Sequence, residues 1–269
     1  MKSFTKPAIF LFLSLFVMSC KAPAPEWASL FDGNSLEQWE IHLGTAYDGW
    51  EDQAATATPG DVFAIAEVDG SKVIHVTGVM NASLASIESF ENYHLRMEFK
   101  WGDEVFTARN SGLLFHSYGP FGPGLGTWMS GHELQLMTGN LGDSYRMGDT
   151  WCEIPVTPTD EGRLVYDSDG EMTGFGEGEL TKIARKSVDA EKPLGQWNAV
   201  DLYCFEGTSV HVINGTVVMV NYNSGYYDGD GLVQPLNSGR LQIQSEGAEL
   251  YLRNIQMRPI TEIPARLLP

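Results

Sequence analysis

Apolar and polar residues alternate along several stretches of this chain, as they do in β-strands that are buried on one face. The alternation is clearest in residues 93–101, where Tyr93, Leu95 and Met97 fall on one face and His94 and Arg96 on the other. Successive side chains of a strand point to opposite faces, so a period of two predicts a strand. The same pattern predicts strands at residues 111–116, 132–137, 199–205, 240–244 and 249–257.

Turn signals between these runs predict how consecutive strands are joined. Asn214-Gly215 lies between the apolar runs 208–213 and 217–222. This dipeptide is typical of a tight hairpin, because both of its turn residues need positive φ. Asp69-Gly70 separates predicted strands at 62–65 and 72–77, and we expect Glu246-Gly247 to be the turn between the last two strands.

Two segments, residues 45–61 and 138–192, show no clear period and are rich in polar residues and glycine. We expect loops there, with a short strand or helical turn at residues 180–186, and a long irregular segment inside a compact domain is usually functional or disordered. The sequence contains no long amphipathic helical pattern and no internal repeat. About a dozen short strands with turn-rich connections predict an all-β sandwich.

Two of the predicted strands carry side chains suited to binding a polar substrate and moving a proton. In residues 132–137 the face opposite Leu134 carries Glu133 and Gln135, and in residues 110–116 one face carries Asn110 and His116. Side by side, these strands would gather all four polar side chains on one sheet face. If the strands at 93–101 and 240–244 lie nearby, that face also carries Arg96, Glu98, Gln242 and Gln244.

Residues 1–19 have the features of a signal peptide. Lys2 and Lys6 accompany an apolar run that is too short to span a bilayer, and the small residue Ser19 directly precedes Cys20. This ending resembles a bacterial lipoprotein signal, which predicts lipidation at Cys20, a tether at 20–26 and a single β-sandwich domain at 27–260. The expected location is the bacterial cell envelope, lipid-anchored at the outer membrane or facing the periplasm. An ordinary signal peptide with an incidental cysteine is the alternative.

The net charge and the cysteine content limit which classes of partner and cofactor we expect. The formal net charge of −18 disfavours nucleic acid and suits a neutral substrate such as a sugar. Cys152 and Cys204 could pair in an oxidising compartment, but two buried free thiols fit equally well. No Gly-x-Gly-x-x-Gly motif follows a strand, so we expect no dinucleotide. We predict no cofactor; a divalent cation on acidic loops is conceivable, although solvated loops explain these residues as well: Asp143, Asp149, Asp167 and Asp169.

Short motifs spread through most of the chain resemble the 3-keto-disaccharide hydrolase family, formerly a domain of unknown function. Each motif alone is weak, but their order and spacing are specific. They are Leu30-Phe31-Asp32-Gly33, Phe90-Glu91-Asn92-Tyr93, Asn110-Ser111-Gly112-Leu113, Glu133-Leu134-Gln135, Gly195-Gln196-Trp197-Asn198, Asn214-Gly215, Leu241-Gln242-Ile243-Gln244 and Arg253-Asn254-Ile255. The resemblance implies a concanavalin A-like jelly roll of two curved antiparallel sheets, with a sugar site on the concave face.

This chain departs from the family pattern at three places, which bear on substrate choice more than on fold. The family often has Arg where His116 stands and Tyr where His132 stands. Many relatives have Asp-His-Gly where residues 245–247 read Ser-Glu-Gly.

The family name implies a sugar that is already oxidised at C3, made by a separate sugar oxidoreductase. A base removes the acidified C2 proton, the C1 leaving group departs and water adds back. We expect Glu133 to be the base and His116 the acid or enolate-stabilising donor. Sugar contacts would come from Asn110 and Gln135, with ring stacking on Trp151 or Trp128, and Arg96, Glu98 and Gln244 are second choices. The alternative function is a non-catalytic, glycan-binding lipoprotein, because fold does not fix function.

Overall fold

The computed structural model describes residues 1–2 and 25–269. The predicted lipidation site Cys20 lies outside the described residues, as does nearly all of the predicted signal peptide and tether. Within the described residues, no helix is long and apolar enough to cross a bilayer.

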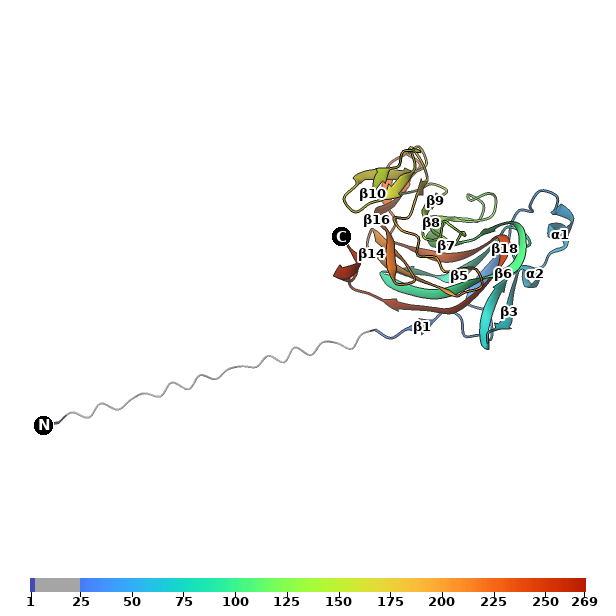
Figure 1. Ribbon diagram of the computed structural model, residues 1–269, viewed down its shortest axis with the longest axis horizontal. Coiled ribbons are helices and arrows are strands. Elements are labelled where there is room, and N and C mark those ends of the chain that lie inside the picture. The colour runs from blue at the N-terminus through green and yellow to red at the C-terminus, as the bar shows by residue number, and fades with distance from the viewer. Residues whose placement is uncertain (3–24) are drawn as a thin grey trace.

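Two curved antiparallel sheets pack face to face, as expected for a jelly-roll sandwich (Figure 1). We call one of them the back sheet. Its strands run in the order β3 (Phe63–Val68), β4 (Ser71–Val76), β18 (Ser238–Pro259), β6 (Tyr93–Asn110), β14 (Asn198–Phe205), β15 (Thr208–Ile213) and β16 (Thr216–Tyr227). The two-residue strand β1 (Ala28–Ser29) pairs with the end of β18.

The other sheet, which we call the front sheet, shares β18 with the back sheet. Its order is β2 (Trp39–Leu43), β5 (Ala82–Glu91), β18, β7 (Gly112–Tyr118), β8 (Ser130–Gln135), β9 (Ser144–Met147) and β13 (Ile183–Ala184). The first half of β18 pairs with β5 and β7, and its second half pairs with β4 and β6. A single strand therefore connects the two layers.

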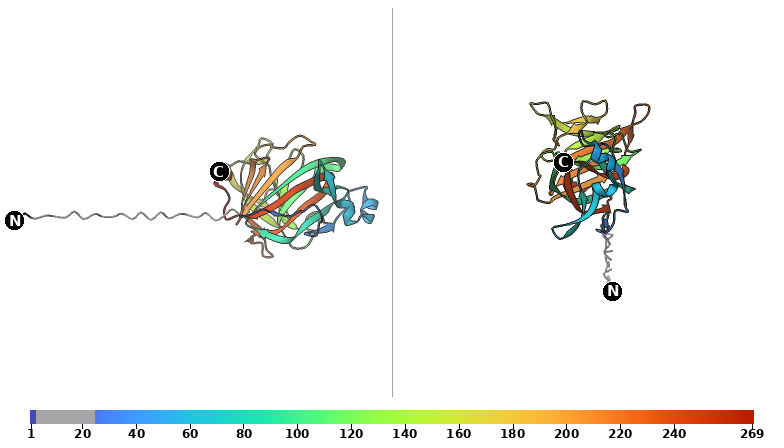
Figure 2. Two further views of the ribbon diagram at one scale, coloured as in Figure 1. Left: turned by 90° about the horizontal axis from the view of Figure 1, so that it is seen from below. Right: turned by 90° about the vertical axis from the view of Figure 1, so that its right-hand side faces the viewer.

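Smaller elements surround the sandwich. A projecting group contains β10 (Thr150–Pro158), β11 (Leu164–Tyr166), β12 (Glu171–Gly176) and β17 (Val233–Pro235), joined to the end of β16. The short helices α1 (Glu51–Thr56) and α2 (Pro59–Val62) lie at one end of the sandwich, and the C-terminus with the 3₁₀ turn Ala265–Leu267 lies at the other (Figure 2).

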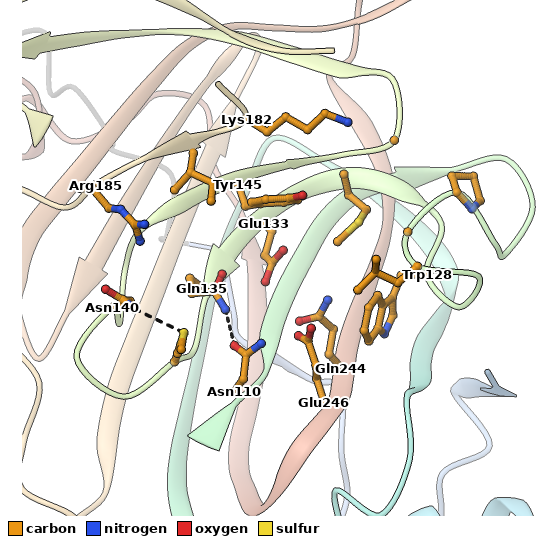
Figure 3. Close-up of a pocket in the computed structure, with 17 residues that line it drawn as sticks. Asn110, Trp128, Glu133, Gln135, Asn140, Tyr145, Lys182, Arg185, Gln244 and Glu246 are labelled. Atoms are coloured by element: carbon orange, nitrogen blue, oxygen red, sulfur yellow. Dashed lines mark hydrogen bonds between the residues drawn. The ribbon is translucent and has the colours of Figure 1, made fainter. Parts of the chain in front are cut away.

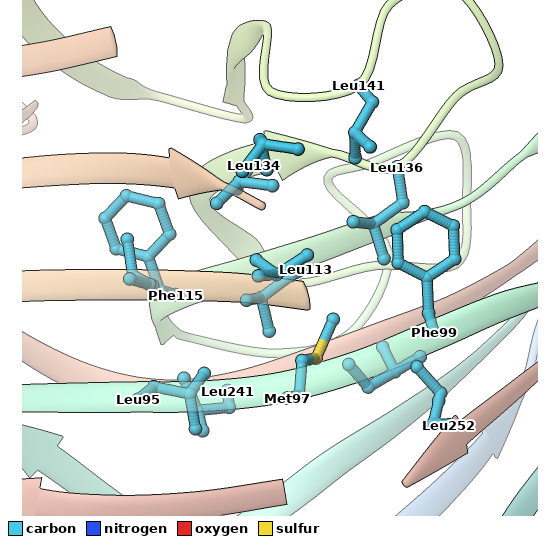
Figure 4. Packing of buried hydrophobic residues seen from close by; sticks show 14 of the residues in the cluster. Leu95, Met97, Phe99, Leu113, Phe115, Leu134, Leu136, Leu141, Leu241 and Leu252 are labelled. Carbon is cyan, nitrogen blue, oxygen red and sulfur yellow. The ribbon is translucent and has the colours of Figure 1, made fainter. Parts of the chain in front are cut away.

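The core lies between the two sheets and is built by the alternating apolar residues. On β6 these include Leu95, Met97 and Phe99, which are at most 1% exposed. Opposite them lie apolar side chains of the front sheet and its loops, among them Leu113, Phe115, Leu134, Leu136, Leu141 and Leu241 (Figure 4). Burial of this apolar area stabilises the sandwich by roughly 25 cal/mol per Å².

The clearest turn prediction is confirmed. Asn214 and Gly215 have φ of 49° and 84°, and they connect β15 to β16 as a tight hairpin. Positive φ at both positions is what favours this dipeptide. Cys152 and Cys204 are both buried and free, so the free-thiol alternative holds.

Three sequence predictions about elements are wrong. Residues 138–192 were expected to be irregular apart from 180–186, where β13 lies, yet they also contain β9 to β12. The expected loop at 45–61 contains α1 and most of α2. Glu246-Gly247 is no turn: β18 continues through it with shifts in register, and Gly247 has a φ of 105°.

Candidate active site

A pocket of about 480 Å³ opens on the outer face of the front sheet (Figure 3). Strands β8, β9, β13 and β18 and the loop before β8 form its floor and walls. Its polar and charged lining consists of Asn110, Glu133, Gln135, Asn140, Tyr145, Lys182, Arg185, Gln244 and Glu246, and its apolar lining includes Leu125, Trp128, Met137, Met147 and Ile183.

The period of two on β8 positions two of the predicted site residues. Glu133 and Gln135 line the pocket, whereas Leu134 and His132 are buried on the opposite side of the strand. The prediction that Glu133 and Gln135 share the polar face is confirmed. On β9, Tyr145 faces the pocket in the same way and lies in register with Glu133.

Glu133 is the most enclosed acid of the pocket. Its side chain belongs to a residue that is only 3% exposed, and no hydrogen bond to it is found among the described residues. Burial raises the pKa of its carboxyl well above the ordinary value, the nearby charge of Glu246 raises it further, and Arg146 opposes the shift. A carboxyl in this setting favours its neutral form.

Glu246 is a second acid in the same pocket and was missed by the sequence analysis. Gln244 and Glu246 are two residues apart on β18 and both line the pocket. Burial raises the pKa of Glu246 to about 7. The alternation of β18 could have identified it, because Gln242, Gln244 and Glu246 are two residues apart and lie on the same face of the strand. This signal was missed because Glu246-Gly247 was interpreted as a turn.

Two amide side chains complete the polar floor. Gln135 donates a hydrogen bond from Nε2 to Asn110 Oδ1 at 2.6 Å and another to the Ser111 carbonyl at 3.2 Å. The Nε2 group of Gln135 is therefore engaged, which leaves its Oε1 as the acceptor it can offer. The structure brings four predicted binding residues into this pocket: Asn110, Gln135, Gln244 and Trp128.

The aromatic walls differ from those predicted. Trp128 is fully buried and donates from its indole nitrogen to the Ala82 carbonyl at 3.1 Å, so it is a fixed wall rather than an open stacking platform. Trp151 lies on β10 outside this pocket and donates to Glu179. The half-buried ring of Tyr145, which was not predicted, lies across the pocket above Glu133 (Figure 3).

The predicted position of His116 is wrong. His116 has a φ of 50°, and the register between β7 and β8 shifts between Phe115 and Tyr118. This bulge breaks the alternation and turns the imidazole into the interior, where it packs against Tyr93 and His132 at ring separations of 5.9 and 6.4 Å. Burial lowers its pKa to about 4. His116 does not line the pocket that contains Glu133.

The predicted positions of Arg96 and Glu98 are also wrong. Both lie on the part of β6 that belongs to the back sheet. Arg96 contacts Asp201 at 3.1 Å, and Glu98 accepts a 2.7 Å bond from Arg253 rather than from Arg96 or Lys100. Alternation assigns a residue to a face but does not say which sheet the strand joins.

The four loop aspartates considered for a cation do not form one cluster: Asp167 and Asp169 share a turn, in which the Asp169 backbone N–H donates to Asp167 at 3.1 Å, and the other two have different partners. Asp143 pairs with Arg185 at 2.7 Å, Asp149 accepts from Tyr118 at 2.5 Å, and Asp167 accepts from Thr157 at 2.7 Å. Among residues 1–2 and 25–269, no three His, Cys, Asp or Glu side chains gather in an arrangement suited to a metal ion.

Two curved antiparallel sheets with a polar pocket on one outer face place this protein in the class of concanavalin A-like jelly-roll sandwiches. More specifically, the chain belongs to the family described as the 3-keto-alpha-glucoside-1,2-lyase-like domain, whose model matches residues 26–258.

Several solved structures resemble this one at low sequence identity. A candidate glycosyl hydrolase from Parabacteroides distasonis is 20% identical, with a TM-score of 0.50 over 87% of this chain and 100% of its own. A second candidate glycosyl hydrolase from that organism is 18% identical, with a TM-score of 0.49 over 87% and 94%. A Bacillus subtilis protein of unknown function with a galectin-like fold is 15% identical, with a TM-score of 0.45 over 88% and 97%. No curated protein matches the sequence.

Proposed function

We propose that this protein cleaves the glycosidic bond of 3-keto-glycosides by elimination followed by hydration. Membership of a family described as 3-keto-alpha-glucoside-1,2-lyase-like supports this reaction class. The observation that carries the proposal is the presence of two carboxyl groups with raised pKa, Glu133 and Glu246, in one pocket.

The chemistry requires groups that can accept and donate protons near neutral pH. A ketone at C3 acidifies the C2 proton, so a base can remove it. The electron pair left on C2 forms the C1=C2 double bond as the bond from C1 to the glycosidic oxygen breaks, and that oxygen takes up a proton. Water then adds across the double bond. General acids and bases contribute about 10²- to 10⁴-fold each when their pKa lies near the working pH.

The pocket supplies these groups without His116. Glu133 and Glu246 are the two carboxyl groups that act on the substrate, one by proton transfer and one by hydrogen bonding, so the pocket needs no histidine. Asn110, Gln135 and Gln244 provide hydrogen-bonding groups for sugar hydroxyls, and the Tyr145 ring provides an apolar surface for the sugar ring. A separate sugar oxidoreductase supplies the ketone, and lipid on Cys20 holds the enzyme in the cell envelope.

The test is to incubate the protein with a 3-keto-glucoside and with its unoxidised parent and to follow aglycone release. Release from the ketone alone is the expected result. Release from the parent would show a conventional hydrolase and contradict the elimination route. Sugar binding with release from neither compound would show the alternative, a glycan-binding lipoprotein of the same fold.

A further inference from the structure

The amide oxygen of Gln244 is a buried acceptor at the pocket wall, and no donor reaches it among the described residues. The residue is 1% exposed. A Cβ atom built on Gly112 would lie 2.4 Å from this oxygen and 2.2 Å from Glu133 Oε1. The two oxygens therefore lie beside the same small space, which exists because residue 112 has no side chain.

Two oxygens so placed attract each other only if one of them carries a hydrogen. An amide oxygen has none to give, whereas a protonated carboxyl has one O–H donor. A neutral Glu133 would therefore offer the buried acceptor of Gln244 a donor, whereas an ionised Glu133 would place a negative charge on its side of the shared space. Leaving such a buried acceptor unpaired destabilises the folded protein, because the acceptor has lost its hydrogen bonds to water.

The groups around Glu133 act in the same direction with one exception. Glu246 is the nearest other acid and repels a charge on Glu133, and the enclosed setting disfavours it further. Arg146 attracts that charge from the opposite side of the sheet, where its guanidinium is held by His132 and Ser144. Tyr145 faces the carboxyl in register on β9.

Glu246 has a different environment. Glu246 lies where the register of β18 shifts. It lines the pocket and is partly exposed, whereas Glu133 is buried. Gln244 precedes Glu246 by two residues on β18, and its amide oxygen lies beside Glu133 at the space left by Gly112. The Glu246 carboxyl therefore has access to solvent through the pocket and can be ionised when Glu133 is not.

We propose that Glu133 is a neutral hydrogen-bond donor, held by Gln244, and that Glu246 is the base that removes the C2 proton. The assignment rests on the proposed function and reverses the base role expected from the sequence. Glu246 takes the proton from C2, and the protonated Glu246 returns it to the glycosidic oxygen as the C1–O bond breaks. The Glu133 O–H turns from Gln244 to the C3 oxygen and stabilises the enolate that forms there.

The first experiment measures the proton on Glu133 directly by infrared difference spectroscopy without substrate. At about pH 8 a carboxyl with a pKa near 7 is ionised, so only Glu133 should contribute the C=O stretch of a protonated acid from this pocket. The band should vanish in Glu133→Gln, persist in Glu246→Gln and shift in Gln244→Met, which removes the acceptor. Absence of the band would overturn the proposal, because Glu133 would then be ionised and the Gln244 amide would donate to it. Loss of the band only in Glu246→Gln would overturn it as well, because the proton would then be on Glu246.

The second experiment compares turnover of a 3-keto-glucoside. Glu246→Gln should lose about 10²- to 10⁴-fold in kcat, because the base is gone. Glu133→Gln should lose about tenfold or less, because the glutamine amide still donates. The exposed Glu262→Gln is the matched control, and thermal unfolding checks the fold of each variant. The opposite order of losses would contradict the assignment. If the parent protein releases no aglycone, the proposed function fails while the infrared result still decides the state of Glu133.

Discussion

The acids of the back sheet and those of the pocket lie in opposite environments. Asp201 on β14 is partly buried, but it accepts from His94 at 2.6 Å and from Arg96 at 3.1 Å. Burial raises its pKa, yet the His94 hydrogen bond and the Arg96 charge outweigh this and hold the pKa below the usual value. Glu133 and Glu246 are enclosed and have no such donors in the described part of the chain, and burial raises their pKa values.

The difference shows what distinguishes a candidate catalytic acid in this sandwich from a structural one. Both kinds lie on strands, and both are partly or wholly withdrawn from water. The back-sheet acids are matched by cations that keep them ionised, so they stabilise the fold. Within residues 1–2 and 25–269 no hydrogen-bond donor contacts the carboxyl groups of the pocket acids, and their charge is destabilising unless a substrate or a proton compensates it.

The largest expected effect is on the free energy of unfolding. Removing an acid's charge should raise this free energy in the pocket and lower it in the back sheet. The folded pKa of Glu246, about 7, is above its ordinary value of 4.5, so its contribution to stability is complete below pH 4.5 and is lost as the pH rises through 7. Glu246→Gln should therefore unfold with a free energy about 3 kcal/mol higher at pH 8 and about equal at pH 4. Denaturant titrations at the two pH values measure this. A less stable variant at pH 8 would contradict the comparison.

The second-largest expected effect is a loss of activity when the small space beside Gly112 is filled. Gly112→Ala places a methyl group within 2.4 Å of Glu133 Oε1 and Gln244 Oε1, so both side chains must move. A displacement of this kind can cost about 10²-fold in rate. Steady-state kinetics with a 3-keto-glucoside would test it. Gly229→Ala is a suitable control, because Gly229, like Gly112, has no positive φ, and nothing lies within 4 Å of a Cβ built on it.

Removing the charge of a back-sheet acid should destabilise the fold. Asp201→Asn weakens two hydrogen bonds to cationic or ionisable partners, and such bonds contribute about 1.5–3 kcal/mol each. We expect a loss of about 2 kcal/mol at pH 7, measured by denaturant titration beside Glu246→Gln. A gain of stability in both variants would show that acids in the two regions do not differ in the way described.

The smallest expected effect concerns the attachment of the first described strand. The guanidinium groups of Arg96 and Arg258 both contact the Trp27 ring, with their Cζ atoms 4.8 and 4.7 Å from its centroid. Cation–π contacts at partly exposed sites contribute about 0.5–1 kcal/mol each. Trp27→Leu should therefore lower stability by about 1 kcal/mol and leave turnover unchanged. A change in kcat would indicate coupling between the two outer faces.

Much of the fold followed from local patterns, because alternation and turn chemistry act over a few residues. The pattern at residues 132–137 placed Glu133 and Gln135 together, and Asn214-Gly215 marked its hairpin. His116 could not be placed this way, because a single non-glycine residue with positive φ reverses every face that follows it. Arg96 failed for another reason: which sheet a strand joins depends on pairings between residues far apart in sequence.

The site was harder to predict than the fold for related physical reasons. Glu246 lies in a strand of 22 residues that bends from one sheet into the other, and its local sequence is typical of a turn. Tyr145 and Lys182 come from a polar segment whose short strands are fixed by the neighbours they pair with. Long-range contacts, rather than local propensity, bring these residues to Glu133.

The position of Trp27 also bears on how the protein is presented to its surroundings. The ring contacts Arg96 on the outer face of the back sheet, whereas the pocket opens on the outer face of the front sheet. Seven peptide units separate Cys20 from Trp27, a reach of at most roughly 25 Å. With a lipid on Cys20, so short a connection would hold the back sheet toward the bilayer and turn the pocket away from it. The substrates within reach would then be freely diffusing glycosides rather than sugars attached to that membrane.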